Sequence, residues 1–474
     1  MAAAGTVGRL LREAGAGPVV WVASGDVAAW SAGLAAEGFQ MVAAPDGADV
    51  VVVADTSWND APLFRRRRFL LSLHDRLSPA ALLALVPAGW ERPAGECGYE
   101  VIAIADGCVL ARVVAAVAPD QAGEAYEGEG SLDLRWSPDE VDWLRPDPRG
   151  VWHEVTAVAE TARAYALHDP YGGHRGAAVL SRHLGCPIDP GHVTFGAGVA
   201  SLLRDLVALA DGGTVLVGRY GFADVPGWVT QARSPVRVFD ESAAWCEAIR
   251  RARPSLVIAD RPTQRGVVHP VDQALAEASR LGAVVVIDEA NANYLDPAQS
   301  AAWLTARHDN LVVVRGLSKG YCQGGLRVGY AIASAALSRR VRAAVPALQT
   351  SELALQVALR MLALPDPLAG LRARIAEMRP RTERALTAFG LQPDPGHPAL
   401  PWLTAPATAL DRLAERGVLA KRLRAADRSA PDLAKIAVPL SDERAAMLTD
   451  ALTDAPTDRA AGPADALTDR AKTP

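Results

Sequence analysis

Short hydrophobic runs alternate with helix-like stretches along the first quarter of the chain. The hydrophobic runs are PVVWVAS (18–24), FQMVAA (39–44), DVVVVAD (49–55) and YEVIAIADGCVLARVV (99–114). Several are continuously apolar, which is typical of buried parallel strands. VAAWSAGLAAEG (27–38) and SPAALLALV (78–86) have helical patterns. The alternation predicts a small Rossmann-like α/β domain over residues 1–118, which carries neither a GxGxxG turn nor a Walker-type loop.

A longer alternation of the same kind extends from residue 151 to about 340. Its strand-like runs are HVTFGAG (192–198), TVLVGRY (214–220), PVRVFD (235–240), SLVIAD (255–260), AVVVIDEA (283–290) and NLVVVRG (310–316). Helix-like segments such as SLLRDLVALA (201–210) lie between them. Because strand–helix–strand repetition favours a mostly parallel central sheet covered by helices, we expect a large α/β domain over 151–340.

The other segments have different patterns. Residues 341–452 are mainly helical and close with the strand-like run LAKIAVPL (433–440), which predicts a smaller C-terminal domain. Residues 119–150 are acidic and rich in Gly, Pro and Trp, as expected of a linker or arm between domains. The tail, 453–474, has no core-forming pattern and is expected to be disordered.

Composition narrows the class of protein. The net charge of -5 gives no reason to expect nucleic acid or a membrane surface as the main partner. The five cysteines are scattered and form no CxxC pair, so we expect a reducing cytoplasm and no thiolate metal site. The N-terminus lacks a signal-peptide pattern, and no apolar run is long enough to span a membrane.

Lysine is rare in this chain, because only four of the 49 basic residues are lysines. Lys319 lies in VVVRGLSKGYCQGGLRVGY (312–330), between a strand-like run and a glycine-rich turn. A lysine amine can lose its proton and act as a nucleophile, whereas an arginine guanidinium stays charged. The position therefore raises the question of what a primary amine does there that a guanidinium could not.

Further candidate residues lie along the same alternation. GAGVASLLRDL (196–206) places glycines before a helix, whose first backbone N–H groups suit a phosphate. Asp288 ends the apolar run AVVVIDEA, where α/β sheets bind ligands. Tyr220 follows another such run, and Arg327 lies eight residues after Lys319. Taken singly, each has an ordinary alternative: a strand–helix turn, a helix cap or a core tyrosine.

Together, LSKGYCQGGLRVGY, AVVVIDEA and RYGFADVP resemble segments of the fold-type I enzymes that depend on pyridoxal 5'-phosphate (PLP). These form the aminotransferase class I/II superfamily, and the branch of histidinol-phosphate aminotransferase and threonine-phosphate decarboxylase is the most similar in style. The resemblance covers roughly residues 130–450. It implies an α/β fold-type I PLP-dependent transferase, which acts on a small amine or amino acid as a homodimer with active sites at the interface.

The resemblance also implies roles for individual residues. Lys319 would form the Schiff base with PLP and then move protons at the substrate α-carbon. Asp288 would keep the pyridine nitrogen protonated, and Tyr220 would stack on the ring. Arg327 would bind the phosphate with its guanidinium fork. Four further positions are expected to contribute: the backbone of Val199 and Ala200, the hydroxyl of Ser318, and Tyr171, lent across the dimer interface.

Three places depart from the family pattern. DRPTQRG (260–266) stands where the family has N-P-x-N-P-T-G, so Thr263 takes the place of an asparagine that binds the phenolic oxygen of PLP. Asn291 takes the place of a tyrosine that contacts the same oxygen, and Tyr294 lies three residues later as a candidate substitute. Lys435 stands at or near the place of the arginine that grips the substrate carboxylate. Either the alignment slips around 260–266 or the recognition shell is remodelled.

Several reactions fit this reading. One is an aminotransferase-like reaction in specialised, natural-product biosynthesis. The alternative is elimination, γ-replacement, cyclisation or C–C bond-forming annulation, for example on S-adenosylmethionine or an arginine derivative. A PLP-binding transcription regulator is a third possibility. It would need a basic helix-turn-helix module, which the strand-rich N-terminal segment does not resemble.

Overall fold

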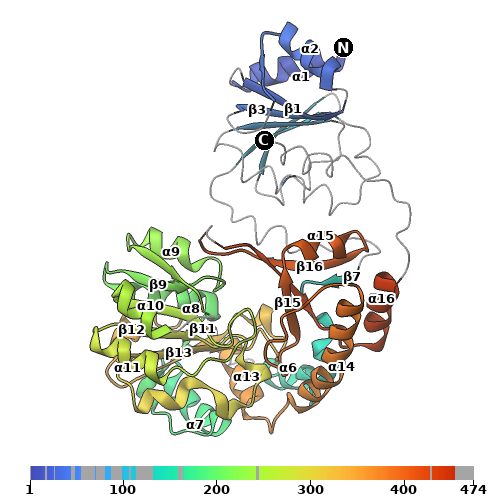
Figure 1. Cartoon of the computed structure of the whole chain (residues 1–474). Helices are drawn as coiled ribbons and strands as arrows, with labels where there is room; N and C mark the ends of the chain where they lie inside the picture. The colour runs from blue at the N-terminus through green and yellow to red at the C-terminus, as the bar shows by residue number, and fades with distance from the viewer. Residues whose placement is uncertain are drawn as a thin grey trace. The chain divides into compact units, whose positions relative to one another are not determined.

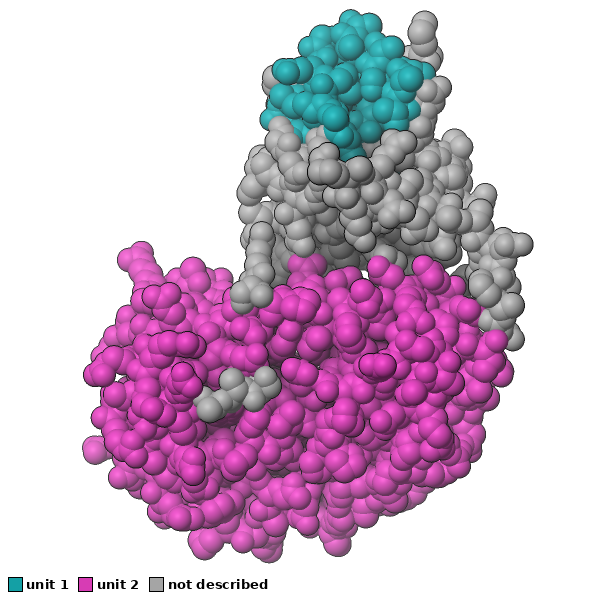
Figure 2. Space-filling view, viewed as in Figure 1, with its two compact units in different colours: residues 1–131, 455–474 teal, residues 132–454 magenta. Residues whose placement is uncertain are grey.

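The protein is described here from a computed structural model. The structure describes residues 2–16, 19–25, 27–43, 48–54, 70, 81–86, 99–105, 108–113, 132–158, 163, 165–241, 245–427 and 430–453. The chain separates into two compact units, one formed by Met1–Ser131 with Ala455–Pro474 and the other by Leu132–Asp454 (Figure 2). The predicted tail lies outside the described residues from 454 onward.

The first unit contains a six-stranded sheet in the order β2-β1-β3-β4-β6-β5. Its strands are β1 Val19–Gly25, β2 Gln40–Met41, β3 Val50–Ala54, β4 Leu82–Val86, β5 Tyr99–Ala105 and β6 Cys108–Val113. Strands β1 to β4 are parallel, whereas β5 and β6 form an antiparallel hairpin. The two described helices of ordinary length are α1 Ala2–Glu13 and α2 Val27–Ala36.

The predicted helix at 78–86 is wrong for its described part. Leu82–Val86 is strand β4, paired with β3 on one side and β6 on the other. Leu82, Leu83, Ala84 and Leu85 are all buried, as in a central strand covered on both faces. A short continuous apolar run does not distinguish a buried strand from a buried helix by its periodicity.

The second unit is built around a seven-stranded sheet in the order β10-β9-β11-β12-β13-β14-β8 (Figure 1). Its strands are β8 Val193–Gly196, β9 Val215–Gly218, β10 Val236–Phe239, β11 Leu256–Asp260, β12 Val284–Asp288, β13 Leu311–Gly316 and β14 Gly329–Ala333. Only β14 runs against the others. The carboxyl ends of the parallel strands therefore meet at one edge, which the N-terminus of β14 shares.

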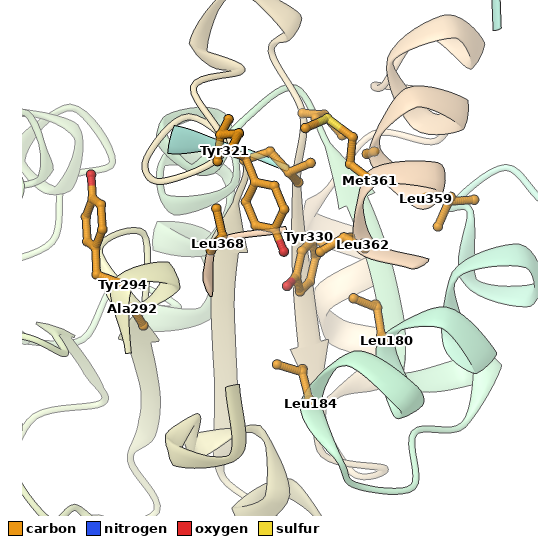
Figure 3. Packing of buried hydrophobic residues seen from close by; sticks show 14 of the residues in the cluster. Leu180, Leu184, Ala292, Tyr294, Tyr321, Tyr330, Leu359, Met361, Leu362 and Leu368 are labelled. Carbon is orange, nitrogen blue, oxygen red and sulfur yellow. The ribbon is translucent and has the colours of Figure 1, made fainter. Parts of the chain in front are cut away.

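Helices cover both faces of this sheet. On one face lie α8 Val199–Leu206, α9 Val225–Gln231 and α12 Ser338–Ala344. On the other lie α10 Trp245–Ala252 and α11 Asp272–Arg280, with α7 Gly173–Leu184 and α13 Glu352–Ala363 near β8 and β14. The last group packs on a cluster in which the hydroxyls of Tyr321 and Tyr330 point toward each other (Figure 3). This layered arrangement is the α/β sandwich expected from the sequence.

A second sheet of four strands lies in the same unit, in the order β15-β17-β16-β7. Its strands are β7 Leu132–Leu134, β15 Trp402–Pro406, β16 Val418–Leu423 and β17 Leu433–Ala437, and its helices are α14 Ala369–Ala388, α15 Thr408–Ala414 and α16 Asp442–Thr453. Of the predicted arm, 119–150, the described part supplies β7, the short helix η2 Pro138–Trp143 and the start of α6 Pro148–Thr156. Because β7 pairs with β16, this part belongs to the second unit.

No helix among the described residues is both long and apolar enough to cross a membrane. They also contain no cluster of His, Cys, Asp and Glu that could hold a metal ion.

A buried ion cluster joins the ends of three central strands. Glu289, just after β12, is fully buried and accepts from Arg315 of β13 at 2.6 Å. The same carboxylate lies 3.1 Å from Arg261, which follows β11. Ser300 and the backbone N–H of Ala301 also donate to it, at 2.6 and 2.7 Å. One carboxylate thus compensates two guanidinium groups in a site removed from water.

Substituting Glu289→Gln should lower the free energy of unfolding by about 3 kcal/mol or more, because it leaves the buried charge of Arg315 uncompensated. Urea denaturation measures this directly. The matched control is Glu154→Gln, which removes an exposed carboxylate paired with Arg360 and should cost less than about 1 kcal/mol. Equal losses in the two variants would contradict the importance of the buried cluster.

Candidate active site

Two aspartates lie side by side at the carboxyl edge of the large sheet. Asp260 ends β11 and Asp288 ends β12, and the parallel register places them directly opposite each other. Both are buried. Burial, and then the negative charge of Asp288, raise the pKa of Asp260. Burial also raises the pKa of Asp288, although the Ala290 N–H, which donates to it at 2.8 Å, acts in the opposite direction. A cation held here would relieve the repulsion between the two carboxylates.

Arg327 lies against the N-terminus of α8, beside the same edge. A Cβ added at Gly198, which has a φ of 88°, would lie 2.9 Å from a terminal nitrogen of Arg327. A Cβ at Gly329 would lie 2.9 Å from the backbone nitrogen of Val199, so glycine at this position lets the helix start approach β14. The first backbone N–H groups of a helix, here those of Val199 and Ala200, have no partner within the helix. These glycines, the N–H groups without a partner in the helix and the guanidinium together suit a phosphate group, and we call them the phosphate cradle.

Ser318 and Lys319 occupy the loop between β13 and β14. A Cβ on Gly324, whose carbonyl accepts from Arg327 at 3.0 Å, would lie 3.9 Å from Cβ of Ser318. The loop therefore brings Ser318 near the Arg327 side of the site. The Lys319 carbonyl is held by the side-chain amide of Asn293 at 2.8 Å, and the same amide binds the Gly316 carbonyl at 2.7 Å.

Tyr220 follows β9 and is largely buried. Its hydroxyl donates to the Pro431 carbonyl at 2.7 Å, and its backbone N–H donates to Glu241 at 2.9 Å. Tyr220, Glu241 and Thr263 line one small cavity. The hydroxyl of Thr263 accepts from the Val267 N–H at 3.1 Å, so it closes the turn of its own segment.

A hydrogen-bonded chain leads from Asp260 to Lys435. Gln264 donates to Asp260 at 2.8 Å and accepts from the Lys435 ammonium at 2.9 Å. The ammonium also lies 3.8 Å from the ring centroid of Trp402, within the range of a cation–π interaction. Gln264 belongs to the unusual segment DRPTQRG, and its role is not visible from the sequence.

The segment DEANANY supports the lysine loop. Tyr294 donates its hydroxyl to both oxygens of Glu140, at 2.9 and 3.1 Å, so its only O–H is already engaged by a protein carboxylate. In Figure 3 Tyr294 stands apart from Tyr321 and Tyr330. Asn291 is buried at the edge that carries Asp288.

Within one chain, the structure does not bring Tyr171 to the other candidates. Its hydroxyl donates to the backbone carbonyl of Arg342 at 2.9 Å. The Arg342 guanidinium in turn donates to Pro190 and Val193, at the start of β8 and away from the Gly198 turn. The interface role expected for Tyr171 stays a prediction.

Asp260, Glu241, Gln264 and Glu140 are site residues that sequence reasoning missed. Each is a polar residue within an otherwise ordinary strand end, turn or arm. Of the four, only Asp260 could have been noticed in the sequence, because it ends an apolar run in the same way as Asp288. The other three become neighbours of the candidate residues only through the tertiary fold.

Comparison with known proteins identifies the family. Residues 174–452 match the family model for aminotransferase class I and II. The chain belongs to this family. Over 240 residues it is 30% identical to the aromatic amino acid aminotransferase of Mycobacterium tuberculosis (strain ATCC 25618 / H37Rv), covering 48% of this chain and 67% of that protein. Over 178 residues it is 34% identical to histidinol-phosphate aminotransferase 2 of Gluconobacter oxydans, covering 36% of this chain and 50% of that protein.

Solved structures of the family have the same fold. Histidinol-phosphate aminotransferase from Sinorhizobium meliloti, in complex with PLP, superposes with a TM-score of 0.56 at 21% identity, over 68% of this chain and 89% of that one. The enzyme from Clostridium acetobutylicum gives 0.58 at 16% identity, over 68% and 98%. These findings confirm the predicted fold type, the class of PLP-dependent transferase and the cofactor. The roles of individual residues remain predictions.

Gly198→Ala should weaken cofactor binding about tenfold or more, because the added methyl group displaces the Arg327 guanidinium. A PLP titration followed by absorbance gives the dissociation constant. Gly212→Ala is the matched control, since Gly212 has a φ of 74° but a Cβ there would meet nothing within 4 Å. If both variants bind PLP equally well, Gly198 is not part of the phosphate cradle.

Glu241 generates a prediction about pH. Burial, and after it the charge of Asp260, raise the pKa of Glu241 from 4.5 to about 7. The folded protein therefore holds this proton to a higher pH than the unfolded chain, and its stability falls as pH rises through this window. Glu241→Gln removes the effect, so the variant should gain up to about 3 kcal/mol relative to wild type between pH 5 and 8. Urea denaturation across this range is the measurement; a constant difference between the proteins would refute the assignment.

Proposed function

We propose that the protein is an aminotransferase-like PLP enzyme that acts on an amino-acid-type substrate in specialised, natural-product biosynthesis. The observation that carries the proposal is a juxtaposition at one edge of the large sheet. Asp288 ends β12, the Lys319 loop follows β13, and Arg327 packs on the first turn of α8. Acid, amine and phosphate cradle are the three parts that this chemistry requires.

Each residue of the candidate site would have a distinct role toward the cofactor or the substrate. Bound PLP supplies an electron-withdrawing ring that stabilises negative charge at the substrate α-carbon. Lys319 would hold the cofactor through its primary amine and then move a proton at that carbon. Asp288 would keep the ring nitrogen protonated. Arg327 would fix the phosphate end together with Ser318 and the backbone at Val199 and Ala200, and Tyr220 would stack on the ring.

Lys435 is the proposed anchor for the substrate carboxylate. Its ammonium group is oriented by Gln264 and Trp402, and an ammonium offers a point charge instead of a bidentate fork. The Trp402 ring adds an apolar surface beside that charge. The names of the relatives, which refer to aromatic amino acids and histidinol phosphate, support an amino-acid-type substrate with a ring-bearing side chain.

A second candidate is elimination, γ-replacement, cyclisation or C–C bond formation on an activated amino acid. The feature that favours it is Asp260, a second buried acid in register with Asp288. Because the charge of one aspartate promotes protonation of the other, the pair offers a proton-holding group beyond Lys319. Reactions that expel or add a group at a side-chain carbon require such additional acid–base steps. The homodimer implied by the resemblance and the cytoplasmic location expected from the scattered cysteines belong to this proposal as well.

Incubating the purified protein with PLP and candidate amino acids separates the two reactions. Pyridoxamine phosphate together with a keto acid indicates transamination, whereas regenerated PLP with an eliminated or coupled product indicates the alternative. Lys319→Ala should abolish the covalent cofactor band and slow turnover by about 10³-fold, within the range for loss of a general acid–base group. Lys421→Ala, at another of the four lysines, is the matched control and should leave both unchanged. An unaltered cofactor band in Lys319→Ala would falsify the central assignment.

A further inference from the structure

Glu140 lies in η2, before the region that matches the family model, and it reaches the lysine loop. The residue is only 8% exposed. Its carboxylate accepts the Tyr294 hydroxyl at 2.9 Å, and the backbone of Gly320, the residue after Lys319, lies close enough to lower the pKa of the acid. The thiol of Cys322 lies 3.9 Å from one of its oxygens. One buried acid from the N-terminal side of the unit therefore contacts two residues, Tyr294 and Cys322, next to the turn that carries the lysine.

The backbone of the lysine turn is held at Lys319 and crowded at Gly320. Asn293 donates to the Lys319 carbonyl at 2.8 Å. Gly320 has a φ of 73°, and a Cβ there would lie 3.2 Å from Cβ of Asn293. The turn thus has little freedom to rotate, and it places the lysine within electrostatic range of the Glu140 carboxylate.

The groups that face Glu140 allow its charge to change near neutral pH. Burial raises the pKa of Glu140 to about 7, while the Tyr294 hydrogen bond and then the positive charge of Lys319 lower it, and the nearby Asp139 raises it. Burial also raises the pKa of the Tyr294 hydroxyl and of the Cys322 thiol, in both cases with a contribution from the charge of Glu140. Tyr294 and Cys322 therefore stay neutral where Glu140 titrates, so the change of charge among these three groups falls on Glu140.

We propose that Glu140 is a positioning residue for Lys319, whose carboxylate holds the lysine turn and whose negative charge stabilises the ammonium form of the lysine. The inference deepens the proposed function and rests on Lys319 being its reactive amine. The physical reason is reciprocity: if the ammonium stabilises the ionised acid, the ionised acid stabilises the ammonium by the same free energy. The acid therefore sets the pH at which the amine becomes free to react.

Competitive labelling of the full-length chain, before any cofactor is added, tests this directly. The chain is treated with trace acetic anhydride at a series of pH values, and mass spectrometry quantifies acetylation of each lysine. In Glu140→Gln, Lys319 should be labelled about tenfold faster at pH 8 than in wild type, because a charge loss worth one pKa unit changes the free amine by that factor. Lys421 and Lys435, in the same digest, should be labelled equally in both proteins.

Two further variants make the outcome specific. Tyr294→Phe keeps the carboxylate but removes its hydrogen bond, so Glu140 should ionise at higher pH and Lys319 labelling should exceed wild type near pH 7 and approach it above pH 9. Glu154→Gln, which removes an exposed acid on α6, should match wild type throughout. Circular dichroism and thermal unfolding establish that each variant is folded.

Identical Lys319 labelling in wild type, Glu140→Gln and Tyr294→Phe would overturn the proposal. A covalent cofactor band that survives in Lys319→Ala would instead overturn the proposed function while leaving the labelling result intact. The two failures are therefore distinguishable. A second readout in the holoenzyme, the pH at which the bound cofactor changes absorbance, should move in Glu140→Gln and stay fixed in Glu154→Gln.

Discussion

The sharing of Glu289 between Arg315 and Arg261 is the constraint from which the arrangement of the site follows. The carboxylate is fully buried, and its two guanidinium partners come from the strand on either side of β12. Arg315 also donates to Asn293 at 3.0 Å, and Asn293 holds the Lys319 carbonyl. This buried cluster thus fixes the neighbouring strand ends and, through Asn293, the backbone of Lys319. Breaking such a cluster on one side leaves a buried charge without compensation, so the arrangement has little tolerance for partial change.

The site concentrates buried acids, and their burial and closeness raise the pKa values of Asp260 and Glu241. Asp260 and Asp288 face each other, and Glu241 lies close enough to Asp260 to repel it. Gln264 separates the Lys435 ammonium from Asp260, so this positive charge acts at a distance. Acids placed together in a low dielectric favour any ligand that brings positive charge. A protonated pyridine ring and a substrate ammonium have that property, which connects the electrostatics of these residues to the class of ligand proposed for the protein.

The sequence offered candidate site residues where they lie in recognisable local segments. Lys319 and Asp288 follow or end a strand and Arg327 comes shortly before one, and strands are visible as apolar runs. Glu140 and Gln264 were missed because their partners are 154 and 171 residues away, at Tyr294 and Lys435, and hydropathy carries no information on such pairs. The interpretation of 78–86 as a helix failed for a different reason: a short apolar run has the same composition in a buried strand as in a buried helix. The spacing of motifs therefore indicated which residues are candidates for the chemistry. The contacts that hold the lysine loop in place became visible only in the tertiary structure.

The parallel pairing of β7 with β16 has a practical consequence for anyone who wishes to produce the catalytic unit alone. Leu132–Leu134 occupies an edge of the sheet that Trp402–Pro406 and Leu433–Ala437 complete from the far end of the chain. An expression clone that began at residue 151 would discard that edge strand together with Glu140, and it would leave the main-chain groups of Val418–Leu423 open to pairing with other molecules. Cloning boundaries drawn around the family match would thus favour aggregation, and a start before Leu132 is the natural choice.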